Sequence, residues 1–444
     1  MINNKTPRQR PVLSTFQRFA RAEYFSGILL LLATLVAMLW ANSPWKETYS
    51  AIWATKITVG IGDFAISKSF FLWINDGLMA VFFFVVGLEI KREILVGELS
   101  SPRQAVFPIA AALGGMAVPA LFYTLVNVGG PGEPGWGVPM ATDIAFALGI
   151  LSLLGKRAPL SLKIFLTAVA IVDDIGAVLV IAIFYSENIV MANLIAAGVI
   201  LLLLFGLNRA QVRSPLPYAI LGIFLWVALL TSGVHATIAG VLLAITIPAK
   251  QKINSENFVR RSRNLVDGFE NAGEAGKATL PNKDQRSFLT SMERNVEHVR
   301  APLQRLEHFL HPYVSYGIMP LFALANAGVS LGSGFSAALT DKISIGIILG
   351  LVLGKQLGIS LSAWLVTRLG WAERPAGISW WQIYGVAWLA GIGFTMALFV
   401  SDLAFPSNEM LETAKVGILT ASLICAIGGS IILSRVRVNR KSKT

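Results

Sequence analysis

The sequence predicts an all-α polytopic membrane protein of about twelve transmembrane helices, and three observations support this fold class. Hydrophobic residues make up 55% of the 444 positions and charged residues only 14%, whereas soluble proteins carry about 25% charged residues. Apolar runs long enough to cross about 30 Å of hydrocarbon recur along the whole chain. Lysine and arginine gather in the two tails and in alternate loops.

The apolar runs predict twelve spans, and the position of each boundary is defined to within several residues. The first span is too long for the apolar region of a signal peptide, and no small-residue cleavage site follows it, so we expect it to remain part of the structure. The spans cover residues 23–41, 71–90, 106–127, 139–154, 162–184, 190–207, 216–231, 233–248, 312–330, 343–366, 384–402 and 412–434.

Positive charge follows this topology. Of the 37 Lys and Arg residues, 31 lie in the tails and in or beside alternate loops, five lie in or beside the opposite loops, and Lys355 alone lies far from both ends of a span. This is the positive-inside distribution, which predicts a bacterial inner-membrane protein with both termini in the cytoplasm and therefore an even number of spans. The net charge of +12 is explained by topology in the lipid membrane, so no nucleic-acid partner is expected.

The expected organisation has five parts. The longest hydrophilic break is rich in Lys, Arg, Asn, Glu and Ser, and we expect a solvated, partly disordered linker there. Residues 56–69 predict an outer hairpin. Cys425 is the only cysteine, so we expect neither a disulfide nor a thiolate-bound cofactor. The parts are a cytoplasmic tail (1–22), spans one to eight (23–249), a hydrophilic cytoplasmic loop (250–304), spans nine to twelve (305–434) and a basic cytoplasmic tail (435–444).

Two spans combine glycine with polar residues at mid-membrane depth. They read Ala-Thr-Asp-Ile-Ala-Phe-Ala-Leu-Gly (141–149) and Ala-Gly-Ile-Gly-Phe-Thr-Met-Ala-Leu-Phe (390–399). Such segments are candidate discontinuous helices, whose freed backbone groups are tolerated only around a protein-lined cavity. One in each half of the chain predicts inverted repeats, with the two broken helices crossing at a binding site near the membrane midplane.

Two adjacent carboxylates lie within a span, Asp173 and Asp174 in Ala-Ile-Val-Asp-Asp-Ile-Gly-Ala (170–177). Each costs at least about 2.5 kcal/mol to insert, so each needs a reason. Consecutive helical residues point about 100° apart, so the pair can flank one cavity. Burial and like-charge repulsion favour protonation, and an arriving Na⁺ or Li⁺ favours ionisation, so cation and protons compete for the same oxygens. The alternative is a neutral, hydrogen-bonded pair that holds helices together.

Three further residues extend this predicted site. Thr142 is a candidate oxygen ligand, because hard cations prefer oxygen. Asp143 is better placed to neutralise the positive end of a half-helix than to bind the ion. Lys355, in Leu-Gly-Lys-Gln-Leu-Gly (353–358), is expected to pair with an aspartate and to be displaced by sodium. The alternative for Lys355 is a permanent structural counter-ion.

Other ionisable residues mark the ends of spans. Asp76 is expected to line a polar funnel at the outer mouth of span two, and Lys91 and Arg92 are expected to be solvated anchors. Histidine titrates in the physiological range, which makes histidines and their acidic neighbours candidates for pH sensing, with ordinary helix-start polarity as the alternative. The pH-sensing candidates are Glu89, Glu93, His235, Glu307, His308 and His311.

These motifs together resemble the NhaA family of bacterial sodium/proton antiporters over nearly the whole chain. The resemblance implies that Asp173 and Asp174 bind the ion, that Asp143 and Lys355 balance the crossed helices, and that Glu89, Glu93, Glu307 and His308 respond to pH. Inverted repeats are a known property of that family and are not an independent result here. The motifs are Trp-Ile-Asn-Asp-Gly-Leu-Met-Ala-Val-Phe-Phe (73–83), Val-Gly-Leu-Glu-Ile-Lys-Arg-Glu (86–93), Ala-Thr-Asp-Ile-Ala-Phe-Ala (141–147), Val-Asp-Asp-Ile-Gly-Ala (172–177), Ser-Gly-Val-His-Ala-Thr (232–237), Arg-Leu-Glu-His-Phe-Leu-His-Pro (305–312) and Gly-Phe-Thr-Met-Ala-Leu-Phe (393–399).

Two departures from the family pattern stand out: a longer hydrophilic loop at 250–300, and Gln356 where proline is frequent. We expect an electrogenic sodium (lithium)/proton antiporter, a secondary transporter and not an enzyme, that extrudes Na⁺ in exchange for external H⁺. A homodimer formed through the 56–69 hairpin is a further expectation. A sodium-coupled solute symporter is the main alternative. The sequence lacks the Gly-x-Gly-Asp signature of intramembrane aspartyl proteases, which argues against an enzyme of that class. Residues 350–356 lack the loop length and the Ser or Thr of a phosphate-binding loop, which argues against an ATP-driven pump.

Overall fold

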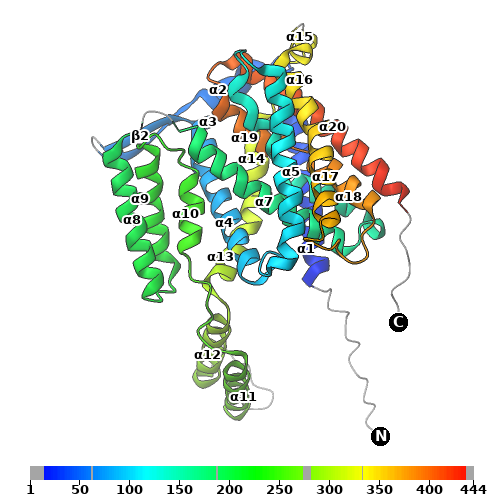
Figure 1. Cartoon of the computed structure of the whole chain (residues 1–444). Coiled ribbons are helices and arrows are strands. Elements are labelled where there is room, and N and C mark those ends of the chain that lie inside the picture. Colours follow the sequence, from blue (N-terminus) through cyan, green and yellow to red (C-terminus); the bar gives the residue numbers. More distant parts are fainter. Residues whose placement is uncertain (1–14, 62–63, 187–188, 274–281, 333, 437–444) are drawn as a thin grey trace. The chain divides into compact units, whose positions relative to one another are not determined.

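The computed structural model describes residues 15–61, 64–186, 189–273, 282–332 and 334–436, most of them helical (Figure 1). The helices divide into two compact units. Unit 1 comprises residues 1–78, 98–185 and 315–444, and unit 2 comprises residues 79–97 and 186–314. Each unit is therefore built from segments that are far apart in the sequence.

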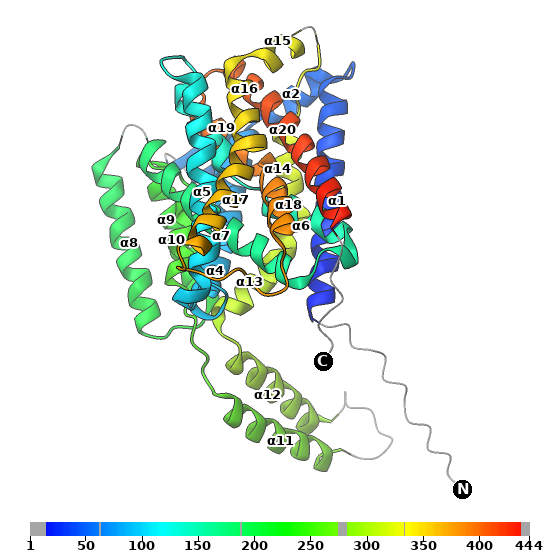
Figure 2. The same cartoon turned by 45° about the vertical axis from the view of Figure 1, so that its right-hand side comes forward.

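Unit 1 is built around α5, which packs against α7, α16 and α17 (Figure 2). Glycines allow α5 and α17 to approach closely, since a Cβ on Gly358 would lie 2.1 Å from the carbonyl oxygen of Gly114. The helices of unit 1 are α1 (Thr15–Ala41), α2 (Lys46–Ala54), α3 (Phe70–Leu72), α5 (Pro102–Asn127), α6 (Ile144–Leu153), α7 (Leu160–Phe184), α14 (Met319–Asn326), α15 (Phe335–Thr340), α16 (Lys342–Leu349), α17 (Lys355–Arg368), α18 (Trp380–Ala390), α19 (Phe394–Ala404) and α20 (Asn408–Arg435).

Short π-helical and 3₁₀ turns interrupt several of these spans, as expected where backbone must line a site. They are η1 (Trp73–Leu78), η4 (Val314–Ile318) and η5 (Gly350–Gly354), which are π-helical, and η2 (Glu133–Met140) and η3 (Gly155–Arg157), which are 3₁₀.

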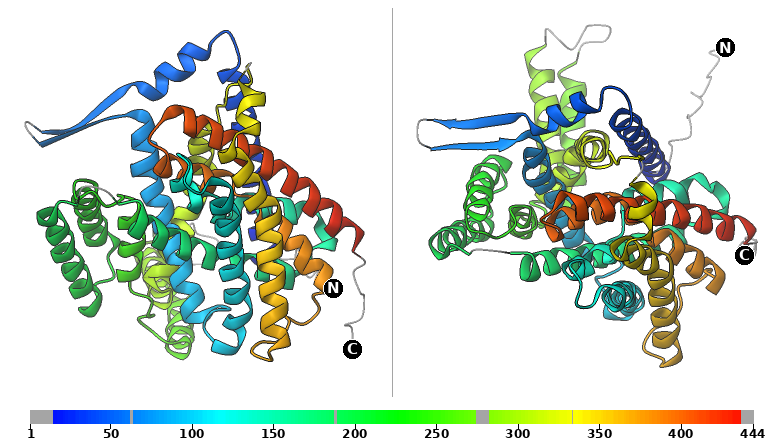
Figure 3. Two further views of the ribbon diagram at one scale, coloured as in Figure 1. Left: turned by 45° about the horizontal axis from the view of Figure 1, so that its top comes forward. Right: turned by 90° about the horizontal axis from the view of Figure 1, so that it is seen from above.

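The predicted hairpin is present as two antiparallel strands, β1 (Lys56–Ile61) and β2 (Phe64–Ser69), with Lys56 opposite Ser69 and Ile61 opposite Phe64. Seen from above, it extends as a long ribbon beyond α2 (Figure 3).

Both predicted helix breaks are confirmed. Residues 141–143 are extended between η2 and α6, and residues 391–393 separate α18 from α19, which are bent by 45° relative to each other. The two breaks meet, because the backbone N–H of Asp143 donates to the carbonyl of Ile392 at 2.7 Å. The freed N–H of Phe394 donates to Ser422 Oγ at 3.2 Å, so protein groups satisfy this part of the broken backbone.

By length and hydropathy, the described residues contain seven helices able to cross a membrane, or nine if each bent pair is one span. The other three predicted spans fall on shorter apolar helices, α9, α10 and α14. The chain is thus an all-α, polytopic membrane protein. The helices at its three shortest predicted spans are too short to meet a criterion based on helix length.

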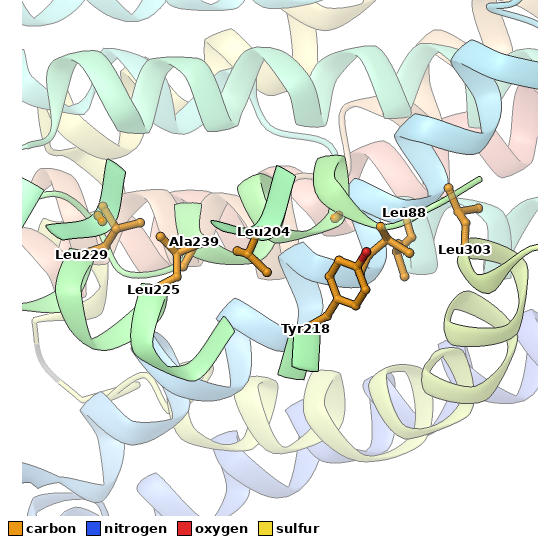
Figure 4. Packing of buried hydrophobic residues seen from close by; sticks show 10 residues of the cluster. Leu88, Leu204, Tyr218, Leu225, Leu229, Ala239 and Leu303 are labelled. Atoms are coloured by element: carbon orange, nitrogen blue, oxygen red, sulfur yellow. The ribbon is translucent and has the colours of Figure 1, made fainter. Parts of the chain in front are cut away.

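Unit 2 contains a hydrophobic core between α4, α8, α9 and α10, with Leu88, Leu204, Tyr218 and Leu225 among the buried residues (Figure 4). Leu303 of α13 closes this core. The helices of unit 2 are α4 (Met79–Val96), α8 (Met191–Arg209), α9 (Pro215–Leu230), α10 (Ile238–Thr246), α11 (Ser255–Asn271), α12 (Lys283–Val299) and α13 (Pro302–Tyr313).

The composition of segment 250–304 predicts a solvated, partly disordered linker, but most of its described residues are helical, and residues 274–281 lie outside the described part. Its described residues form α11 and α12, which pack side by side and project beyond the ends of α8 and α9 in Figures 1 and 2. Phe288 covers Gly268, and Asn295 Nδ2 donates to Ser262 Oγ at 2.9 Å. Each helix thus turns a half-buried face, repeating every three to four residues, toward the other, although the overall hydrophobicity of the pair is low.

Candidate ion-binding site

The two adjacent carboxylates lie near the middle of α7, a continuous helix of 25 residues. Asp173 and Asp174 are each 1% exposed. A carboxylate removed from water to this extent requires a compensating charge, a proton or a bound cation. Their neighbours therefore decide what the pair can bind.

Lys355 reaches Asp173 from the first residue of α17, directly after the π-helical turn η5. Its Nζ lies 2.5 Å from Asp173 Oδ2, and both side chains are 0% exposed. The second oxygen of this carboxylate, Asp173 Oδ1, is buried and accepts no hydrogen bond from the described residues. Leaving such an oxygen unpaired costs about 1–3 kcal/mol, which an incoming cation or proton would recover.

Thr142 connects the carboxylate to the break in the other discontinuous helix. Its Oγ1 lies 2.7 Å from Asp173 Oδ2 and 2.8 Å from the carbonyl oxygen of Ala390, at the end of α18. A hydroxyl has a single proton, so Thr142 donates to one of these oxygens at a time. Its lone pairs remain available to a cation.

Asp143 lies where the positive ends of both half-helices converge. One carboxylate oxygen accepts from the backbone N–H of Phe146 in α6 at 2.9 Å. The other accepts from the backbone N–H of Thr395 in α19 at 3.1 Å and from the Thr395 hydroxyl. One negative charge thus faces two helix N-termini, each of which carries about half a positive charge.

The arrangement places the buried ammonium group of Lys355 and the hydroxyl of Thr142 on the same oxygen of Asp173. Carboxylates of Asp173 and Asp174, the hydroxyl of Thr142 and the carbonyl of Ala390 are ligand types that suit a hard monovalent cation. Lys355 already occupies the position of a positive charge beside Asp173. A cation can therefore enter only in competition with the lysine or with protons.

A second group of predicted residues comes together in unit 2, between α4 and α13. Arg92 is at its centre, with Nε 3.0 Å from Glu307 Oε1 and a terminal nitrogen 3.1 Å from Glu93 Oε1. His311 Nε2 lies 4.0 Å from Glu89 Oε1. The expectation that Arg92 is a solvated anchor is therefore wrong, because its guanidinium group is held by two carboxylates.

Burial and charge shift the pKa values of two members of this group in opposite directions. Burial raises the pKa of Glu307, although the adjacent Arg92 opposes the shift. Burial also lowers the pKa of His311, and the positive charges of His308 and Arg92 add to that effect. The pKa values of Glu307 and His311 are therefore closer to each other than those of a free glutamate and a free histidine.

Lys91 was also expected to be a solvated anchor, and this too is wrong. Its Nζ donates to the carbonyl oxygens of Ile245 and Ile247 at 2.6 and 2.5 Å. These carbonyls lie at the C-terminal end of α10, where a cation is favoured by the helix dipole.

The remaining predicted residues lie apart from these contacts. Asp76 is in η1 and pairs with Lys68 of β2 at 2.6 Å. His235 is in the turn before α10, where its carbonyl accepts from Ile238. Gln356, which replaces the frequent proline, leaves α17 unbroken and accepts a hydrogen bond from Tyr384 at 3.4 Å.

Sequence reasoning missed Thr395, Arg92 and Asp402 as candidates. Thr395 lies in a quoted motif, but nothing local indicates that it faces Asp143, 252 residues away. Asp402 is the last residue of the predicted span 384–402, so a search for carboxylates at span ends would have found it.

Comparisons with known proteins agree with one another. The family model described as Na⁺/H⁺ antiporter 1 matches residues 17–433. The chain is 53% identical over 422 residues to the Na(+)/H(+) antiporter NhaA of Oleidesulfovibrio alaskensis, covering 95% of this chain and 94% of that protein. It is 50% identical to the NhaA of Koribacter versatilis, covering 96% and 92%, and 49% identical to that of Helicobacter pylori strain G27, covering 94% and 95%.

Proposed function

Because this chain belongs to the Na⁺/H⁺ antiporter 1 family, we propose that it exchanges its ions at the buried carboxylates Asp173 and Asp174. It is a multi-pass membrane protein and a Na⁺/H⁺ antiporter. The observation that carries the proposal is the fully buried Lys355–Asp173 pair, 2.5 Å apart, beside a second buried carboxylate where two broken helices meet.

The exchange follows from the charges of these groups. Without sodium, Lys355 neutralises Asp173, and Asp174 carries a proton. Na⁺ or Li⁺ enters among the oxygens of Asp173, Asp174 and Thr142, and its charge drives off the proton of Asp174. If Lys355 also gives up its proton, two protons leave for one cation and the exchange moves net charge. Returning protons expel the cation by the reverse competition, so a proton gradient drives sodium export and the transport is secondary active.

The other predicted ionisable residues have supporting roles: they balance charge beside the ion site, line the outer funnel or make the exchange depend on pH. Asp143 neutralises the two half-helix N-termini, which would otherwise repel the entering cation. Glu89, Glu93, His235, Glu307, His308 and His311 form the pH-responsive set, and five of these six lie on α4 or α13. Asp76 lines the outer funnel.

We further assign the protein to the inner membrane, surrounded by lipid, with both termini and the α11–α12 segment in the cytoplasm. The assignment is supported by the distribution of Lys and Arg among the loops. The β1–β2 ribbon is the proposed contact of a homodimer, since its outer edges leave backbone groups free to pair with another strand.

The central test compares wild type with Asp174→Asn in vesicles that enclose a pH-reporting dye. A proton gradient is imposed, and sodium, lithium or potassium is then added. We expect sodium and lithium to dissipate the gradient in wild type and in the matched control Asp267→Asn, an exposed aspartate of α11. Asp174→Asn should leave the gradient intact. Exchange by Asp174→Asn at the wild-type rate would show that the pair is structural.

A further inference from the structure

A chain of three polar side chains lies in unit 1, outside the ion site. Asn75 Nδ2 donates to Asp402 Oδ2 at 2.9 Å, and Asn326 Nδ2 donates to Asn75 Oδ1 at 3.0 Å. Asn75 is 2% and Asn326 1% exposed, and Asp402 is half-buried. The three residues belong to η1, α14 and α19, so these hydrogen bonds join three segments that are far apart in the sequence.

Asp402 lies near one end of α19, and the ion site lies at the other. Thr395, in the first turn of α19, donates twice to Asp143. Seven residues separate Thr395 from Asp402, which is about 10 Å along a helix. The half-helix α19 is therefore attached at both ends, to Asp143 beside the ion site and to Asn75 away from it.

The two attachments differ in strength. At the ion-site end, Thr395 of α19 donates two hydrogen bonds to Asp143, from its N–H and its hydroxyl, and Phe146 of α6 donates a third that fixes this carboxylate. Asp402 accepts one, from Asn75. The charged groups that act on Asp402 from neighbouring elements are Lys415 of α20 and Asp76 of η1, and each has a nearer partner, Glu412 at 3.2 Å and Lys68 at 2.6 Å.

We propose that Asp402 and Asn75 are positioning residues for the exchange, whose mutual hydrogen bond holds the far end of α19 in the described conformation and is broken in the alternate one. The inference rests on the proposed function, because a fixed ion site must be exposed to each side of the membrane in turn. A half-helix with one firm and one weak attachment can pivot about the firm one. Asp143 keeps α19 at the ion site while the Asp402 end moves.

The inference predicts a change that a merely structural role would not produce. Breaking the bond shifts the population toward the alternate conformation, which binds sodium from the other side. The half-saturating sodium concentration must then fall on one face of the membrane and rise on the other. A loss of folding would weaken binding on both faces.

The experiment measures half-saturating sodium on both faces, using vesicles of the two orientations that contain the full-length protein. We expect Asp402→Ala and Asn75→Ala to change the two values in opposite directions, their ratio shifting on the order of tenfold. Asp402→Asn keeps an acceptor for Asn75 and should give a smaller shift. The double variant should match the single variants, because both remove the same bond.

Glu409→Ala is the matched control, since it removes an exposed carboxylate in the first turn of the neighbouring helix α20 and leaves the Lys415–Glu412 pair in place, and it should leave both values unchanged. Values that rise together on both faces, or that stay at wild type in Asp402→Ala and Asn75→Ala alike, would overturn the inference. Every variant here keeps Asp174, so this outcome is separate from that of Asp174→Asn, which tests the ion site itself.

Discussion

At the scale of single residues, the buried ion pair Lys355–Asp173 governs the site. Burying two charges costs several kcal/mol each, and their attraction repays this only when the geometry is good. A buried ion pair is therefore weak evidence of a stabilising role. Its position between a hydroxyl, a second carboxylate and two helix breaks is better explained by exchange with a cation.

Removing the lysine alone should destabilise the protein. In Lys355→Ala, the carboxylate of Asp173 stays buried without its counter-ion, which costs about 3–5 kcal/mol. We expect a lower melting temperature in detergent at neutral pH, partly restored by sodium, which binds the folded state. The double variant Asp173→Asn/Lys355→Ala should recover most of the loss. Lys342→Ala, at an exposed lysine, is the control, and an equal effect there would contradict this account.

At the scale of elements, we expect contacts between helices to set both the pH response and the packing. Arg92 of α4 and Glu307 of α13 join two helices of unit 2 through one ion pair. Because the pKa of Glu307 is raised, its carboxylate takes up a proton at a higher pH than a free glutamate does. The bond to Arg92 therefore weakens as pH falls through that pKa, while His311, with its pKa lowered, stays neutral to a lower pH.

Replacing Glu307 by glutamine should make the pH dependence of exchange shallower. Glutamine holds the side chain neutral at every pH, so the variant at alkaline pH should behave as wild type does under acid conditions. The measurement is the exchange rate in vesicles across the physiological pH range. Glu297→Gln, at a glutamate 54% exposed that bonds Arg305, should follow wild type. An unchanged profile in Glu307→Gln would remove Glu307 from the pH-responsive set.

The close packing of α5 and α17 gives a second prediction at this scale. A Cβ on Gly358 would meet the backbone carbonyl of Gly114 at 2.1 Å, so the helices must separate in Gly358→Ala. We expect a loss of about 1–3 kcal/mol in stability, seen as a lower melting temperature. In Gly198→Ala, on α8, a Cβ meets nothing within 4 Å. That variant should gain about 0.5–1 kcal/mol, since alanine favours a helix. Equal behaviour of the two would refute the packing argument.

At the scale of the whole molecule, the helices α11 and α12 form an insertion whose two ends meet. The backbone N–H groups of Lys252 and Ile253 donate to the carbonyl of His298 at 3.0 and 3.3 Å. The backbone N–H of Leu303 also donates to the carbonyl of Pro248 at 3.2 Å, so a short linker in place of residues 254–299 keeps a contact between the two flanking segments. The ion site contains no residue of this insertion.

We expect the protein with residues 254–299 replaced by a short Gly-Ser linker to keep its sodium/proton exchange. Vesicle transport at matched protein amounts is the measurement, with Asp174→Asn in the same background as the inactive reference. Loss of exchange in a stably folded, membrane-inserted variant would show that these helices take part in transport.

Local sequence signals predicted the spans, the two breaks and the buried aspartates, because each depends on hydropathy or on polar residues at membrane depth. They failed where long-range contacts decide. The meeting of Thr395 with Asp143 and the bond between Asn75 and Asp402 join segments hundreds of residues apart. The helices α11 and α12 were missed for another reason: low hydrophobicity indicated a linker, although Phe258, Ser262, Leu265 and Phe269 recur at helical spacing.

The buried pair also bears on how the protein is made. Lys355 follows Asp173 by 182 residues. At about 5–20 residues per second, the carboxylate leaves the ribosome roughly ten to forty seconds before its lysine exists. During that interval, the side chain of Asp173 must be either protonated or hydrated. The charge of Lys355 adds about 2.5–3.5 kcal/mol to the cost of inserting its segment. When that segment enters the membrane, Asp173 is already there. The pairing partner of Lys355 is thus made before the lysine itself, and their ion pair forms only after the later segment has entered the membrane.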